Sequence, residues 1–103
     1  MTGVRFEWDE AKNLSNQRKH DGVTFEEARH VFQDPLHVSV QDRIESGEQR
    51  WQTIGAVQGV VILLVAHTLT EDDADGGSVE IIRIISARRA TPRERRRYEN
   101  ENS

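Results

Sequence analysis

Residues 49–66 read QRWQTIGAVQGVVILLVA, and the expected fold depends chiefly on this stretch. In residues 49–57, Trp51 and Ile54 fall on opposite faces of a strand, because successive strand side chains alternate. Gln58-Gly59 is a candidate for a tight turn. Residues 60–66 are apolar on both faces, which is typical of a strand at the centre of a sheet.

Further strands are expected on both sides of this hairpin. Val38 and Val40 alternate with polar neighbours, Ser46-Gly47 predicts a turn, and residues 79–86 form another strand. Residues 70–78, TEDDADGGS, predict a polar, acidic loop. The short links between these strands favour an antiparallel meander of four strands.

Helical signals lie before and after the strands. Asp9 is a suitable N-cap for a helix over residues 10–19. The capping box in residues 24–27, TFEE, begins a second helix, which ends at Asp34-Pro35. A second capping box in residues 91–94, TPRE, begins a helix that runs to about Glu99. The sequence therefore predicts an α+β fold with two N-terminal helices, a four-stranded antiparallel sheet and a C-terminal helix.

Composition limits both the size of the protein and its chemistry. The chain has 103 residues, which predicts a single domain over residues 1–103 with a short polar tail at 100–103. Cysteine is absent, which excludes disulfides, thiolate catalysis and iron–sulfur ligation, and the four histidines lack zinc-site spacing. Neither a metal nor a cofactor is expected. The longest apolar run has seven residues and the N-terminal residues lack a signal peptide's apolar stretch, so a cytoplasmic protein without membrane contact is expected.

Charge is distributed unevenly in this chain of net charge −4. Acidic residues concentrate in residues 71–75, whereas six of the fourteen basic residues lie within ten positions: Arg88, Arg89, Arg93, Arg95, Arg96 and Arg97. Arginine's planar fork suits recognition of phosphate. A local anion-binding face is therefore compatible with an acidic protein, and a solvated helix surface is the alternative.

Two arginines occupy positions that need an explanation. Arg83 interrupts the apolar strand VEIIRIIS, where a charge is costly unless it is paired or faces a wet surface. It is either an anion ligand, an ion-pair partner of Glu80 or of a helix carboxylate, or a charge that protects a sheet edge. Arg88 precedes the last helix, where Arg89, Arg93 and free backbone amides favour an anion, and ordinary surface charge is the alternative.

Titratable groups suitable for proton transfer occur at two further places. His20 ends the first helix and is either an acid–base group or a helix cap. Glu48 and Arg50 share one strand face, where they form either a base with a phosphate clamp or an exposed salt bridge. Lys12 and Lys19 flank the first helix and suit phosphate contacts, whereas His67 is expected to be structural.

Together these residues indicate phosphodiester chemistry without a metal. Such a site needs a base for a ribose 2′-hydroxyl, cations for the charge that develops on phosphate, and an acid for the 5′-oxygen. Histidine, glutamate and arginine are residue types that fill these roles.

Several motifs resemble the BrnT toxins of bacterial type II toxin–antitoxin systems. They are FEWD-x-x-K-x-x-x-N, KH-x-GV-x-FEEA, a glutamate–arginine pair before IG, and RIISAR followed by ER-x-x-YE, and they span nearly the whole chain. The resemblance implies a RelE-like fold and a metal-independent endoribonuclease that inhibits translation and growth. It also implies a cognate BrnA-like antitoxin, whose complex with the toxin binds operator DNA. A homodimer within a heterotetramer is one assembly to consider.

On this resemblance, the positions that match the motifs receive expected roles. The expected catalytic residues are His20, Glu48, Arg50, Arg83 and Arg88. The expected RNA-binding residues are Lys12, Lys19, Arg89, Arg93 and Tyr98, and Glu94 is a further motif position. The alternatives are a non-catalytic partner-binding protein that acts as co-repressor and a standalone nucleic-acid-binding module.

This sequence departs from the family pattern in two places. Val60 stands after Gly59, where the family commonly has arginine, and the acidic segment 71–77 before RIISAR is long. Loss of an RNA-contacting arginine would weaken cleavage, and the acidic segment would repel RNA or contact a basic part of the antitoxin. Both departures favour the non-catalytic alternative.

Overall fold

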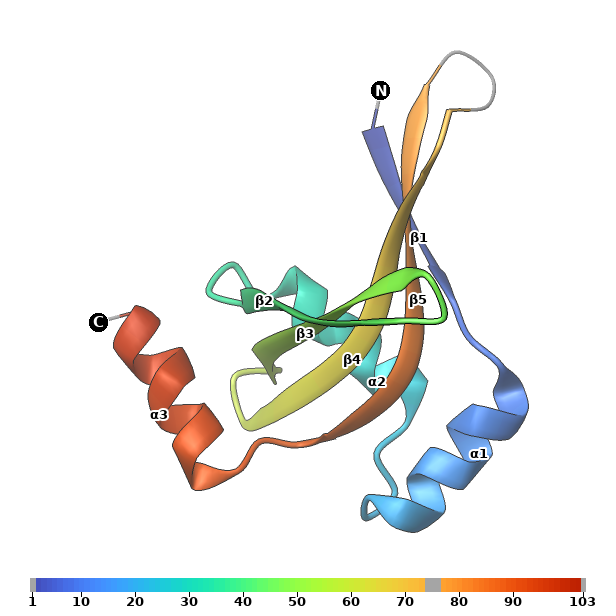
Figure 1. The fold of residues 1–103 in the computed structure, drawn as a ribbon. Coiled ribbons are helices and arrows are strands. Elements are labelled where there is room, and N and C mark those ends of the chain that lie inside the picture. The colour runs from blue at the N-terminus through green and yellow to red at the C-terminus, as the bar shows by residue number, and fades with distance from the viewer. Residues whose placement is uncertain (1, 74–76, 103) are drawn as a thin grey trace.

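The computed structural model describes residues 2–73 and 77–102, which form a five-stranded sheet with helices around it (Figure 1). The strands are β1 (Thr2–Glu7), β2 (Val38–Glu45), β3 (Glu48–Val57), β4 (Val61–Asp72) and β5 (Ser78–Arg89). The helices are α1 (Glu10–Lys19), α2 (Phe25–Ala28), the 3₁₀ helix η1 (Arg29–Gln33) and α3 (Pro92–Glu101). The predicted α+β class is confirmed, and no helix among the described residues is long and apolar enough to cross a membrane.

The predicted meander is confirmed for β2 to β5. The strand order is β1-β5-β4-β3-β2, so the apolar β4 is indeed the central strand, and β2 to β5 pair antiparallel. Both predicted turns have two residues with positive φ: Ser46 and Gly47 at 52° and 80°, and Gln58 and Gly59 at 55° and 69°. Turns of this kind match the twist of antiparallel hairpins.

The prediction of a four-stranded, purely antiparallel sheet is wrong. β1 adds a fifth strand, which pairs parallel with β5 from Thr2↔Ser78 to Glu7↔Arg83. A local signal for this strand exists, because Val4, Phe6 and Trp8 alternate with polar residues. Its partner strand lies at the other end of the chain, so no local pattern reveals the pairing.

Three element boundaries also differ from expectation. The second predicted helix divides into one α-helical turn, α2, and the 3₁₀ helix η1, although both of its expected ends are present. Thr70–Asp72 and Ser78 extend strands into the expected acidic loop, whose residues 74–76 lie outside the described residues. The last helix continues to Glu101, within the expected polar tail.

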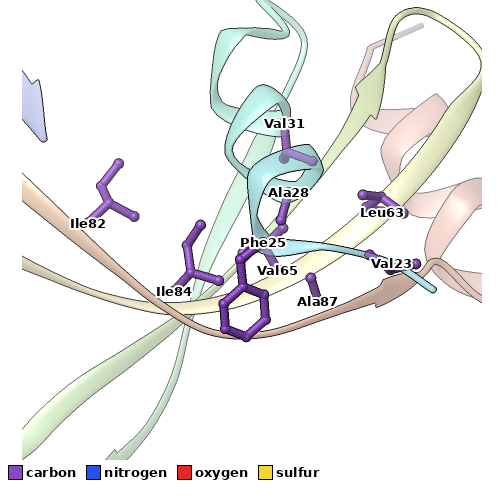
Figure 2. Packing of buried hydrophobic residues seen from close by; sticks show 9 residues of the cluster. All are labelled: Val23, Phe25, Ala28, Val31, Leu63, Val65, Ile82, Ile84 and Ala87. Carbon is purple, nitrogen blue, oxygen red and sulfur yellow. The ribbon is translucent and has the colours of Figure 1, made fainter. Parts of the chain in front are cut away.

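One face of the sheet packs against α2 and η1 and forms the main core. Figure 2 shows this cluster, which consists of Val23, Phe25, Ala28, Val31, Leu63, Val65, Ile82, Ile84 and Ala87. η1 approaches β3 closely at Gly55, where an added Cβ would lie 2.8 Å from a methyl carbon of Val31. Burial of this face fixes which strand side chains point to the other face.

The opposite face is only partly covered. Tyr98 of α3 packs with Ile54 and Leu64, which alternate with the core residues of β3 and β4. α3 therefore covers the end of the sheet nearest the β3–β4 turn. The other end of this face, which we call the open face, is not covered by any helix of the described residues.

α1 completes the edge of β5 that β1 leaves free. β1 pairs with β5 only as far as Arg83. Beyond that point the Asn16 side chain donates to Ala87 O at 2.8 Å and accepts from Ala87 N at 3.1 Å, as a neighbouring strand would. The same amide also donates to Val23 O at 3.0 Å. These bonds fix α1 and its basic residues beside β5 (Figure 1).

Candidate active site

Three side chains lie in one row across the open face. Arg50 of β3 pairs with Thr68 of β4, and Thr68 pairs with Arg83 of β5. Adjacent strands are about 4.8 Å apart, so the Cα atoms of the two arginines are about 10 Å apart. Two guanidinium groups at this spacing can bind one phosphate or neighbouring phosphates of a nucleic acid strand.

Arg50 is the less accessible arginine of the row. Only 22% of its side chain is exposed, and its Nη2 lies 3.9 Å from Glu45 Oε2. Its Nε is buried and has no hydrogen-bond partner among the described residues. A buried donor without an acceptor is costly, so the Arg50 guanidinium has a hydrogen-bonding requirement that the described residues do not meet.

Arg83 is exposed and unpaired within the described residues. The ion pair with Glu80 or with a helix carboxylate, one of the three expectations for this residue, is not formed there. Its neighbour in register, Glu7, contacts Arg5 at 3.4 Å instead. The apolar strand tolerates Arg83 because alternation directs it away from the core that holds Ile82 and Ile84.

Glu48 starts the same strand as Arg50 and shares its face, as predicted from their spacing. Its side chain is half-buried, and its carboxylate makes no hydrogen bond or ion pair with a described residue. A carboxylate beside the arginine row is suitable for accepting a proton from a bound hydroxyl.

A second group of predicted residues gathers where the end of α1 meets β5. A hollow of about 310 Å³ is lined by Lys19, His20, Asp21, Arg88, Arg89 and Thr91. An adjoining hollow of about 250 Å³ is lined by Lys12, Ser15, Asn16, Lys19, His20, Ile85 and Ser86. We call this group the α1 basic cluster. His20 caps α1 through its backbone N–H, which donates to Asn16 O at 2.9 Å, so its ring is available.

The structure does not bring the two proton-transfer candidates together. His20 lies beside Ser86 of β5, whereas Glu48 lies on β3. Two strand spacings and four residues along the strand separate Glu48 from Ser86, which is a distance of about 15 Å. A single phosphodiester cannot contact both groups.

Arg88 has a structural partner. Its Nη1 and Nη2 donate to Glu94 Oε1 and Oε2 at 2.7 and 2.9 Å, which joins β5 to the first turn of α3. The Arg88 hydrogen bonds lower the pKa of Glu94 to about 2, and the Thr91 amide adds to the effect against the opposing influence of burial. The same bonds raise the pKa of Arg88. Since its fork is engaged, Arg88 is less available for phosphate than Arg50 or Arg83.

The two predicted RNA-binding residues of α3 differ in accessibility. Arg93 is exposed in the first helical turn. Tyr98 is only 9% exposed, and its hydroxyl donates to Asp34 Oδ2 at 2.5 Å. Burial and the Asp34 hydrogen bond raise the pKa of Tyr98 to about 12. The Tyr98 hydroxyl is therefore engaged within the fold and is not free to contact RNA.

His67 lies in a buried polar network on the core face. Its Nε2 is 2.7 Å from Thr53 Oγ1, which is 2.7 Å from Ser39 Oγ, and its ring packs edge-on against Phe32. Burial lowers the pKa of His67 to about 4, so the ring is neutral at pH 7. Within residues 2–73 and 77–102, no cluster of three or more His, Asp or Glu side chains could hold a metal ion.

Sequence reasoning missed two residues that shape the site. Thr68 separates the two arginines of the row, and Asn16 positions the α1 basic cluster. Thr68 gave no signal because its neighbours come from different strands. Asn16 belongs to the motif FEWD-x-x-K-x-x-x-N, which pointed to the residue without showing its role.

Comparison with known proteins identifies the family of the chain. The model of a family described as the ribonuclease toxin BrnT of type II toxin–antitoxin systems matches residues 8–94, which include all five predicted catalytic positions. The crystal structure of the Brucella abortus ribonuclease toxin BrnT matches with a TM-score of 0.57 and 21% identity, over 85% of this chain and 97% of that chain. This second likeness concerns the fold, and no curated protein matches the chain. The family match places the chain in the BrnT family of ribonuclease toxins of type II toxin–antitoxin systems.

Proposed function

We propose that this protein is a metal-independent endoribonuclease whose reaction takes place on the open face. The observation that carries the proposal is the row of Arg50, Thr68 and Arg83, in which Arg50 has a buried donor without an acceptor. Arg50 and Arg83 bind the scissile phosphate and stabilise the negative charge that grows on it.

Glu48 is the base in this proposal. It takes the proton of a ribose 2′-hydroxyl, and the 2′-oxygen attacks the neighbouring phosphorus. The bond from phosphorus to the 5′-oxygen breaks, a 2′,3′-cyclic phosphate forms, and the departing oxygen takes a proton from water on this exposed face. We favour Glu48 over His20 because Glu48 shares the face of Arg50.

The α1 basic cluster binds the RNA backbone away from the reaction. Lys12, Lys19 and Arg89 attract phosphates, and His20 lies among them. Arg93 is exposed in the first turn of α3 and follows Thr91, which lines a hollow of this cluster, by two residues. This division explains why basic residues far apart in the sequence lie along one side of β5.

The toxin family further supports a regulatory role within a complex. A type II toxin implies an antitoxin partner. We assign to that partner, a BrnA-like protein, both neutralisation of the toxin and contact with operator DNA, since this chain carries a net charge of −4. RNA cleavage by the free toxin then inhibits translation and growth.

Purified, antitoxin-free protein incubated with cellular RNA in EDTA tests this function. Wild type should release fragments with 2′,3′-cyclic phosphate ends. Arg83→Ala and Arg50→Ala should each lower kcat by about 100-fold or more, as expected when a transition-state donor is removed. Arg43→Ala on β2, an exposed arginine outside the row, is the matched control and should retain activity.

The same assay separates the two candidate bases. Glu48→Gln should lower kcat by about 100-fold or more, and His20→Gln should change it by less than about threefold. The reverse pattern would give the base role to His20. Cleavage only in the presence of ribosomes would make the ribosome part of the substrate, whereas RNA intact under all conditions would favour the non-catalytic co-repressor.

A further inference from the structure

A groove lies between α3, the tip of the β3–β4 hairpin and the segment that follows η1. Its volume is about 550 Å³. The residues that line it are His30, Gln33, Asp34, Pro35, Leu36, Ala56, Gln58, Gly59, Val60, Ile62 and Tyr98. The Asp34 carboxylate in the groove already accepts hydrogen bonds from the Ala56 amide and the Tyr98 hydroxyl. The rest of the groove surface is largely apolar.

Exposed aliphatic side chains concentrate at this groove. Val60 is 82% exposed and Leu36 is 49% exposed. They are two of the five exposed large hydrophobic residues among the described residues, and the other three do not line it. Apolar surface of this kind at the rim of a groove is typical of a protein interaction site.

Positive charge flanks the apolar surface. Val60 and Ile62 also line an adjoining hollow of about 320 Å³, which Arg89 and Arg95 share. Arg95 forms no ion pair within residues 2–73 and 77–102. The groove and this hollow together present aliphatic groups next to guanidinium groups, which complement a segment that carries both apolar residues and carboxylates.

The groove is separate from the arginine row of the open face. Ala56, which lines the groove, is six residues along β3 from Arg50. At the rise of a strand this is about 20 Å. A ligand can therefore occupy the groove without contacting Arg50 or Arg83.

We propose that the groove binds an amphipathic, acidic segment of the antitoxin, an inference that rests on the proposed function for the existence of that partner. Apolar residues of the segment pack on Leu36 and Val60, and its carboxylates pair with Arg95. RNA is a poorer occupant because its bases stack on aromatic rings, and the one aromatic lining residue apart from His30 is the buried Tyr98.

The test measures the Kd of the purified cognate antitoxin for variants of the full chain. Leu36→Glu/Val60→Glu should weaken binding by about 30-fold or more, the size typical of anchor residues in an interface. Ile44→Glu is the matched control, because Ile44 is 69% exposed on β2 outside the groove, and its Kd should stay near wild type. Arg95→Glu should also weaken binding, whereas Arg43→Glu should not.

Three results would decide the matter. The proposal is overturned if the groove variants, with wild-type circular dichroism and thermal midpoints, bind the antitoxin as tightly as wild type. It is also overturned, in favour of RNA as occupant, if they lose RNA cleavage but keep antitoxin affinity. If wild type cleaves no RNA yet the groove variants alone lose the antitoxin, the proposed catalysis fails and the docking surface stands.

Discussion

Arg83 and Arg88 show how little an arginine's sequence position says about its role. Both lie on β5, and the sequence predicts a phosphate contact for both. Arg83 stays exposed on the open face, whereas the Arg88 guanidinium donates two hydrogen bonds to the Glu94 carboxylate. The difference depends on where α3 begins, because the capping box places Glu94 opposite Arg88. Residue type predicts the anion-binding character of the surface, but not which arginine is free.

The Arg88–Glu94 pair predicts acid-sensitive stability. The folded-state pKa of Glu94, about 2, lies below its usual value of 4.5. The pair therefore contributes fully to the free energy of unfolding above pH 4.5, and this contribution is lost as the pH falls toward 2. Glu94→Gln, which keeps a group able to cap α3, should lower the free energy of unfolding by about 1–2 kcal/mol at pH 7 after allowance for solvent screening.

Urea unfolding at pH 7 and pH 2.5 provides the measurement. The difference between wild type and Glu94→Gln should shrink at the lower pH, because wild type has by then lost much of the pair. Glu7→Gln removes an exposed interaction with Arg5 and should change stability by less than about 0.5 kcal/mol. An equal difference at both pH values would show that the ion pair is not the source of the effect.

At the scale of elements, patterns of a few consecutive residues predict the helix starts, turns and strands reliably. The sequence carries no comparable signal for the pairing of distant strands. The capping boxes at Thr24 and Thr91, the two hairpin turns and the central apolar strand are all present as predicted. Each of these depends on a few consecutive residues. The alternation in residues 4–8 is a local signal for β1, but its parallel pairing with β5 joins distant parts of the chain and escapes prediction. η1 escapes prediction because a helical periodicity does not distinguish a 3₁₀ turn from an α-helix.

The junction of α1 with β5 predicts a specific loss of stability. Asn16→Ala would leave the Ala87 amide and two carbonyl groups without their partner, which should cost about 2–4 kcal/mol. Hydrogen exchange at the Ala87 amide should also accelerate relative to other β5 amides. Gln17→Ala, which removes one long hydrogen bond of 3.4 Å to Asn13, is the control and should be nearly neutral. Unchanged exchange at Ala87 would refute the edge-strand role of Asn16.

At the scale of the whole molecule, the proposed site of cleavage and the proposed partner groove lie at different ends of the sheet. The arginine row lies away from the β3–β4 turn, whereas the apolar groove lies beside it. The α1 basic cluster lies along β5 between them and reaches Arg89, which also lines the hollow next to Val60. Val60 belongs to the second region, so valine in place of the family's common arginine changes the partner surface in this proposal more than the RNA surface. The position of Val60 in the groove thus gives a structural meaning to its departure from the family pattern, which motif matching alone does not reveal.

The separation of the arginine row from the α1 basic cluster predicts that RNA binding and RNA cleavage respond separately to mutation. Lys12 and Lys19 face the hollow beside β5, away from the arginine row, so Lys12→Gln/Lys19→Gln should raise KM and leave kcat within about twofold. The slope of log KM against log salt concentration should fall by about 0.7 for each phosphate that the variant no longer neutralises, because fewer counterions are released. Arg18→Gln on the same helix, outside the hollow, is the matched control. A fall in kcat at unchanged KM would instead place the lysines at the reacting phosphate.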